Sequence, residues 1–488
     1  MDHILFVLLL FPILGSVLLA FLPSTFNKKG LRYIAIFMAS ATLSLVFILF
    51  WHFDTSSSEI QFLESYALSA RMGTTFSLGV DGISLPMVFL AALLCFIAIL
   101  ASSAPKLQTK GYYLLMLLLE SAMLGVFMAQ DWSLFYIFWE LTLIPLFFLI
   151  DGWGGKKCQG AALNFVLYTM GGSVFMLLSL LVLFDLVAGH SFSMAVVAKG
   201  AVHLTEEQQV WIFLGFLVGF GVKMPIFPIH GWLPVAHVEA PSPVSILLSG
   251  ILLKMGAYGL IRVVGILPDA VLILQNLLMA LGFFGIIYGG LLAWRQYDLK
   301  RMIAYSSVSH MGVVLVGIAS LNIAGLTGAL MQMVAHGFVA GLLFLLIGLL
   351  YERTGTRNIN DYSSLVQSTP KFAIFTTLAF LASVGMPGTA GFIAELHVFI
   401  GSYEHWSGWV LLLSLGVMIS ATYAIRTVGK LFTGPVLPAM EYVEDLKPSE
   451  WFAAAILALG VIILGFYPEP LLNLISASTH SFISGFGE

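Results

Sequence analysis

Fourteen apolar runs, each about as long as a membrane crossing, constrain the fold of this chain more than any other feature. A spanning helix needs roughly 20 predominantly apolar residues, and the longest polar stretch between runs, residues 52–81, leaves no room for a soluble domain. Only 9% of the 488 residues are charged, against roughly 25% in soluble domains. The sequence therefore predicts an all-α polytopic protein, with one transmembrane domain over residues 1–488. The expected helices cover 3–22, 31–51, 83–102, 112–129, 132–150, 162–187, 210–229, 244–265, 271–293, 302–321, 324–350, 371–400, 407–431 and 451–473.

The seventh and twelfth of these helices are predicted to be discontinuous. Pro225 and Pro228 remove backbone donors within the seventh run, and a freed carbonyl inside a membrane is tolerated only where protein or a water-filled cavity satisfies it. The twelfth run contains the string VGMP at 384–387, which resembles VKMP at 222–225. Both breaks are therefore candidate parts of an ion pathway.

The two breaks also indicate an internal repeat. Each falls in the fourth helix of a five-helix set, helices four to eight over residues 112–265 and helices nine to thirteen over 271–431. Because five is odd, the second set enters the membrane from the opposite side, and inverted repeats with paired broken helices are typical of transport folds. Three helices within residues 1–111 precede the repeats, and the helix at 451–473 follows them.

Five ionisable residues lie within the predicted spans at positions that favour proton transfer. Lys223 and Lys254 lie in two apolar runs joined by a proline-rich segment, and a lysine at the centre of a span costs roughly 2.5 to 3.5 kcal/mol. Glu140 follows the aromatic run FYIFW, Glu395 follows the second break, and Glu120 lies in the fourth span. Because neighbouring opposite charges favour each other's ionised forms, a lysine whose acidic partner moves away can release its proton.

Four histidines extend the set of candidate proton carriers, since an imidazole accepts a proton on one nitrogen while donating from the other. His336 lies deep in an apolar span, and His310 lies one helix earlier. His230 and His237 lie in or near the first proline-rich segment. A packing role competes with a relay role for His310 and His230, whereas the position of His336 favours a relay.

The basic residues predict the orientation of the chain, because loops rich in Lys and Arg stay on the cytoplasmic side. Loops that follow odd-numbered helices hold 16 of the 21 basic residues, Lys106 among them. The other side holds Arg71, Lys199 and Arg262, and the remaining two are the lysines within the spans. Both termini are therefore expected outside, and Arg262 is expected to extend to the outer interface.

Several function classes are disfavoured by what the sequence lacks. Cys95 and Cys158 are too few and too far apart for a disulfide framework, a zinc site or an iron–sulfur cluster. No glycine-rich nucleotide motif and no nucleophile constellation is found, and the small net charge of -4 argues against nucleic acid. No cofactor and no metal is expected on this chain.

Four strings resemble the antiporter-like membrane subunits of respiratory complex I, the proton-pumping NADH:quinone oxidoreductase, over essentially the whole chain. They are FWELTLIPLFFLIDGWGG, VKMPIFPIHGWLPVAHVEAPSPVSILLSGILLKMGAYGL, AYSSVSHMG and MPGTAGFIAELHVFIGSY. Within this family, the length and a glutamate at 395 resemble the branch called chain 4 or M. The sister branches L and N mostly carry lysine at that place.

The resemblance implies roles for five of the candidates, while Glu120 matches an acid of the fourth helix to which it assigns no role. Glu140 pairs with Lys223, Lys254 bridges, His336 continues the relay, and Glu395 is the terminal group opening to the outer side. The expected function is proton translocation across the bacterial cytoplasmic membrane, beside neighbours of the L and N branches. NADH oxidation and quinone reduction then occur elsewhere in a complex that uses NADH, FMN, iron–sulfur clusters and quinone.

Two alternatives remain open on the sequence. The same strings occur in multi-subunit sodium/proton antiporters and membrane-bound hydrogenases, so a cation/proton antiporter module without redox chemistry is the main rival. The other alternative is a scaffold in which the buried charges only lock helices together.

Overall fold

The computed structural model describes residues 3–23, 26–69, 73–103 and 108–486, so Arg71 and Lys106 lie outside the described residues. The predicted helical membrane fold is confirmed. Among the described residues, eleven helices are long and apolar enough to cross a membrane, and Leu85–Ala101 and Pro370–Ser383 are shorter apolar helices.

The chain folds as two compact units. Unit 1 comprises residues 1–224, 251–277 and 473–488, and unit 2 comprises 225–250 and 278–472. Helices α13 (Pro268–Arg295) and α20 (Glu469–Ser484) run from one unit into the other. The other elements of unit 1 are α1 (Ile4–Phe21), α2 (Lys28–His52), β1 (Gln61–Ser69), β2 (Thr74–Val80), α3 (Leu85–Ala101), α4 (Thr109–Met128), α5 (Trp132–Leu141), α6 (Leu143–Trp153), α7 (Cys158–Leu186), α8 (Met194–Ala201), α9 (Glu206–Lys223) and α12 (Leu253–Val264). Those of unit 2 are α10 (Trp232–Glu239), α11 (Ser242–Leu247), α14 (Leu299–Ala319), α15 (Ile323–Thr354), η2 (Ile359–Asp361), α16 (Pro370–Ser383), α17 (Ala390–Trp406), η3 (Ser407–Leu413), α18 (Ser414–Phe432), η4 (Pro438–Met440) and α19 (Pro448–Phe466), and a π-helical segment η1 (Leu248–Leu252) lies between α11 and α12.

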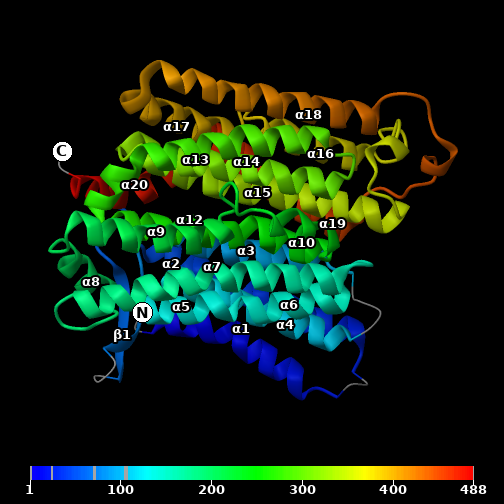
Figure 1. Ribbon diagram of the computed structural model, residues 1–488. Helices are drawn as coiled ribbons and strands as arrows, with labels where there is room; N and C mark the ends of the chain where they lie inside the picture. The colour runs from blue at the N-terminus through cyan, green and yellow to red at the C-terminus, as the bar shows by residue number, and fades with distance from the viewer. Residues whose placement is uncertain (1–2, 24–25, 70–72, 104–107, 487–488) are drawn as a thin grey trace. The chain divides into compact units, whose positions relative to one another are not determined.

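Each unit is built around one deeply buried helix. In unit 1, α4 packs against α1, α3 and α5, while α7 packs against α6 and α9. In unit 2, α15 packs against α14, α16, α17 and α19 and is buried along its whole apolar stretch. The helices within each unit run roughly parallel or antiparallel to one another (Figure 1).

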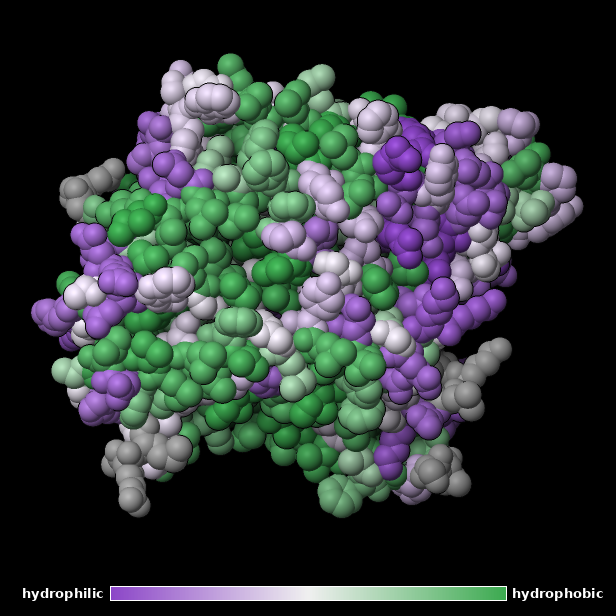
Figure 2. All heavy atoms as spheres, in the orientation of Figure 1, coloured by the Kyte–Doolittle hydropathy of each residue, from purple (hydrophilic) through white to green (hydrophobic). Residues whose placement is uncertain are grey.

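The surface of the helices is apolar where a membrane would cover it. On the face shown in Figure 2, hydrophobic side chains cover the middle of the helices, and hydrophilic side chains gather towards the helix ends. Large apolar side chains such as Leu167, Phe284 and Ile374 are more than half exposed. In water such a surface would be unfavourable, and in lipid it is favourable.

Residues 52–81, expected only as a polar connection, contain an antiparallel hairpin of β1 and β2. The hairpin fastens two helix starts. Glu64 on β1 accepts a hydrogen bond from the backbone N–H of Leu5, in the first turn of α1, at 2.8 Å. Asp131 caps the N-terminus of α5 and also accepts a hydrogen bond from the hydroxyl of Thr75 on β2, at 2.8 Å. Both carboxylates lie where the helix dipole is positive, which stabilises them.

Several predicted helix boundaries were wrong. The fifth helix continues to Trp153 and is interrupted at Thr142. The seventh continues beyond its break as α10, to Glu239. The last apolar helix ends at Phe466, and α20, which was not predicted, follows it. The predicted breaks of the seventh and twelfth helices are present, over residues 224–231 and 384–389.

Arg262, which is expected at the outer interface, is paired with an acid within the protein. Its guanidinium donates two hydrogen bonds to the carboxylate of Asp81, at 2.7 and 2.8 Å, and lies over the ring of Tyr258, 4.9 Å from its centroid. The hydroxyl of Tyr258 donates to the carbonyl of Phe127 at 3.2 Å. The end of α12 is therefore tied to the start of α3 and to α4. Sequence reasoning missed this pairing because Asp81 and Arg262 are 181 residues apart.

This ion pair predicts a pH-dependent stability. Burial raises the pKa of Asp81, but the charge of Arg262 and hydrogen bonds from Arg262 and Ser84 together outweigh burial, so the pKa lies below its usual value. A lowered folded-state pKa adds stability above about pH 4, which is lost as the pH falls through the folded-state pKa.

We therefore expect Asp81→Asn to destabilise the protein at pH 7 by about 3 kcal/mol or more, because a buried guanidinium loses its partner. The difference in the free energy of unfolding between the variant and wild type should become smaller below about pH 4. Thermal unfolding of the detergent-solubilised protein between pH 7 and pH 3 measures this, with the exposed Glu59→Gln as control. An equal deficit at every pH would contradict the role given to the Asp81 charge.

Candidate proton-transfer site

Lys223 is held by direct contacts with the fifth helix. Its Nζ donates to the carbonyl of Trp139 at 3.2 Å and to the hydroxyl of Thr142 at 3.0 Å, and it lies 3.9 Å from the centroid of the Trp139 ring. The side chain is 1% exposed. Carbonyl, hydroxyl and ring face all present negative potential, so together they stabilise an ammonium group.

The local sequence explains why Trp139 and Thr142 are available to Lys223. Pro145 lacks an N–H and crowds the carbonyl four residues earlier, so the helix is interrupted between α5 and α6. Thr142 lies at the interruption, and its hydroxyl donates to the carbonyl of Trp139 at 2.8 Å. On the other side, α9 ends at Lys223 because Pro225 and Pro228 follow it. Lys223 therefore lies at the end of one interrupted helix, α9, and its side chain contacts the interruption between α5 and α6.

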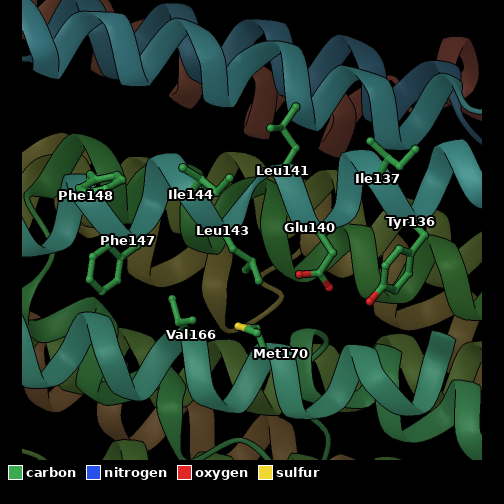
Figure 3. A pocket seen from close by; sticks show the side chains of 10 residues that line it. All are labelled: Tyr136, Ile137, Glu140, Leu141, Leu143, Ile144, Phe147, Phe148, Val166 and Met170. Carbon is green, nitrogen blue, oxygen red and sulfur yellow. The ribbon is translucent and has the colours of Figure 1, made fainter. Parts of the chain in front are cut away.

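Glu140 lies in a groove of unit 1 that is otherwise almost entirely apolar. Its carboxylate and the hydroxyl of Tyr136 point in the same direction, towards the helix that carries Val166 and Met170 (Figure 3). Among the described atoms, its buried Oε1 has no hydrogen-bond partner, and the ion pairs within 4.0 Å do not include one between Glu140 and Lys223. The groove is lined by Tyr136, Ile137, Glu140, Leu141, Leu143, Ile144, Phe147, Phe148, Val166 and Met170.

Lys254 is fully buried on α12, directly after the π-helical segment. π-helical turns occur frequently at functional sites. Helix α12 packs closely on α9, since a Cβ at Gly256 would lie 2.7 Å from the backbone N of Met224 and the carbonyl O of Phe220. The helices that carry Lys254 and Lys223 are therefore neighbours within unit 1.

A second cluster lies in unit 2, around Glu395 on α17. Nδ1 of His310 lies 3.9 Å from Oε1 of Glu395 and 3.3 Å from Nε2 of Gln332. The rings of His310 and His336 are 5.4 Å apart between centroids. All four side chains are buried, so His310 links the acid of α17 to the histidine of α15.

The break in the twelfth helix is shaped around this acid. Gly385 and Gly388 have φ of +76° and +89°, a region in which a Cβ is strained. A Cβ at Gly385 would also lie 2.6 Å from Oε2 of Glu395. Two small cavities reach Glu395 and His310, one along α15 and the other towards α18, so Glu395 can contact water on two sides.

Three other predicted site residues lie outside these clusters. Glu120 is buried on α4, and its carboxylate oxygens have no hydrogen-bond partner among the described atoms. The ring of His230 packs among Phe227, Tyr288 and Tyr305, and that of His237 stacks on Phe344 at 4.6 Å. Packing is therefore the observed environment of both histidines.

Sequence reasoning missed three residues that complete the clusters. Trp139 and Thr142 lie within three residues of Glu140, and Pro145 just after them signals an interrupted helix at this point. Gln332 lies one helical turn before His336, so it shares a helix face with it. Among the described residues, no group of three or more His, Cys, Asp or Glu side chains could hold a metal ion.

Comparison with known proteins identifies the family. The model of the family described as "NADH:quinone oxidoreductase/Mrp antiporter, TM" matches residues 129–420, which include both clusters. The chain belongs to this family of membrane antiporter-like subunits. The resemblance inferred from the sequence strings is thereby confirmed.

Relatives in the NADH:quinone oxidoreductase/Mrp antiporter family include NAD(P)H-quinone oxidoreductase chain 4 of Thermosynechococcus vestitus. It is 42% identical, with 95% of this chain and 88% of that protein covered. The fold matches a chain of respiratory complex I from Thermus thermophilus with a TM-score of 0.91 and 31% identity, over 99% of this chain and all of the other. A chain of the Mrp complex from Dietzia sp. shares the fold, with a TM-score of 0.84 at 23% identity, over 99% of this chain and 52% of the other.

Proposed function

We propose that this chain is a chain 4 (M) subunit of a proton-pumping NADH:quinone oxidoreductase. It translocates protons from the cytoplasm to the outer side of a bacterial cytoplasmic membrane, with both termini outside. The observation that carries the proposal is the pair of broken helices, because each break is next to a buried ionisable group, Lys223 at the first and Glu395 at the second. Sequence similarity to chain 4 proteins over nearly the whole length supports it.

In this mechanism, the residues of this chain only receive, hold and release protons. Lys223 takes up a proton from the cytoplasmic side, and Lys254, His336 and His310 pass protons on to Glu395, which releases them outside. Glu140 controls Lys223: a nearby carboxylate favours the ammonium form, and its withdrawal favours proton release. The inverted repeats over residues 112–265 and 271–431 are the proposed framework for the two clusters.

The energy for proton translocation comes from other subunits, which oxidise NADH and reduce quinone with FMN and iron–sulfur clusters. In this proposal, those other subunits hold all of these cofactors. Neighbours of the L and N branches are the proposed partners in the membrane. The groove around Glu140 supports the proposal that a protein neighbour covers it. Lipid chains would offer no hydrogen-bond donor to the carboxylate of Glu140, whereas a protein side chain can.

The decisive experiment is purification of the native assembly, followed by transport in sodium-free proteoliposomes. We expect flavin- and iron–sulfur-containing chains to copurify, and NADH with a quinone to drive proton movement that an uncoupler abolishes. Copurification with membrane chains alone, together with sodium/proton exchange that needs no NADH, would instead establish an antiporter module.

A further inference from the structure

The short helix α10, the second half of the broken seventh helix, ends against two cations. Nζ of Lys300 donates to the carbonyl of Ala240 at 2.9 Å, and Nη1 of Arg357 donates to the carbonyl of Val238 at 2.5 Å. The last carbonyls of a helix lack partners and carry the negative end of its dipole. Here Pro241 and Pro243 also remove the donors that would follow. The two cations therefore replace the missing donors and complement the dipole.

The two cations are themselves fixed in place. Lys300 lies in the first turn of α14, and this helix start pairs with the segment around Arg357 through backbone hydrogen bonds, from Leu299 N to the carbonyl of Arg357 at 2.9 Å and from Ile359 N to the carbonyl of Tyr297 at 2.8 Å. Nε of Arg357 lies 3.1 Å from the carboxylate of Asp298, and its guanidinium lies 5.0 Å from the centroid of the Tyr351 ring. Lys300 is 2% exposed. The pair is therefore a preorganised anchor and not two solvated surface charges.

The anchor matters because α10 is short and depends for its position on its contacts with α14, which carries Lys300, and with Arg357. Helix α10 has eight residues, well under the roughly 12 to 15 at which isolated helices become even marginally stable. The segment Met224–Gly231 alone connects it to Lys223, the last residue of α9. Displacement of α10 would therefore pull on the break that begins directly after Lys223.

We propose that Lys300 and Arg357 are positioning residues, a two-cation anchor that holds α10 and the proline-rich break in the arrangement needed for proton transfer. This inference rests on the proposed function, since it assigns the anchor to the pathway that begins at Lys223. Neither residue touches the transferred proton.

The test uses the whole purified complex with Lys300→Met, Arg357→Met and both together, which keep side-chain bulk and remove the charged donors. Hydrogen–deuterium exchange of residues 224–241 should rise about tenfold, as expected for losing hydrogen bonds from charged donors. Protons moved per quinone reduced should fall at least about twofold in the double variant. Lys300→Arg, which keeps charge and donors, should restore both. Arg301→Met, an exposed cation on the same turn, is the matched control and should change neither.

Unchanged exchange at 224–241 in the double variant would overturn the anchor, and so would raised exchange with undiminished pumping. If Arg357→Met prevents assembly, it is replaced by Arg357→Lys, which keeps the charge and loses the planar fork. The same two measurements apply, exchange at 224–241 and protons moved per quinone reduced. Failure of the proposed function would look different, because the wild-type complex itself would then show no NADH-driven proton movement.

Discussion

Lys223→Met is expected to reduce NADH-driven quinone reduction and proton uptake together, by about a hundredfold or more, in membranes where the complex still assembles. The magnitude follows from the contribution of a positioned proton carrier. Methionine has a similar length and suits a buried site, but it neither accepts a proton nor donates to Trp139 and Thr142. Both rates are measured on membrane vesicles at equal complex content, with Lys199→Met, an exposed lysine outside the spans, as control.

Lys223→Arg separates proton transfer from helix locking. Arginine keeps the positive charge and the donors, but it does not release its proton in proteins. Transfer through Lys223 therefore predicts a complex that assembles and does not pump. A scaffold of locked charges predicts nearly normal pumping, and that result would refute the role given to Lys223.

Glu395→Gln is expected to have a comparable effect in the second cluster. The amide preserves the shape and can still bond to His310, which lies 3.9 Å from the carboxylate, but it cannot take up and release a proton. Proton uptake should fall about a hundredfold or more, measured as for Lys223. Glu404→Gln is the matched control, because Glu404 is an exposed acid on the same helix. Its Oε2 accepts a hydrogen bond from Asn322. Pumping retained in Glu395→Gln would exclude this carboxylate from the pathway.

The features predicted correctly from sequence were those with a local physical signature. Prolines and glycines break helices wherever they occur, so the interruptions after Lys223 and before Glu395 could be read from VKMP and VGMP. Apolar length alone predicted a helical membrane protein. The roles of Glu140, Lys254 and His336 in proton transfer remain predictions.

The features that were missed depend on contacts between distant residues. The partner of Arg262 directly follows the hairpin, 181 positions earlier, and nothing in the short strands β1 and β2 distinguishes them from a polar loop. The π-helical segment before Lys254 contains Ser249 and Gly250, but neither residue type by itself specifies a π-helical turn. The ligands of Lys223 were missed because they are a backbone carbonyl and a threonine hydroxyl more than 80 residues earlier, and a backbone carbonyl has no side-chain signature.

The ligand set of Lys223 has a consequence for how the residue changes its protonation state. The Thr142 hydroxyl accepts from the ammonium and donates to the Trp139 carbonyl, and a hydroxyl can rotate to donate to a neutral amine instead. Both forms of Lys223 are then satisfied with the nitrogen in one place. In the proposed pathway, the nitrogen of this lysine therefore stays in place while a single hydroxyl turns, so the reorganisation energy of its immediate ligands is small.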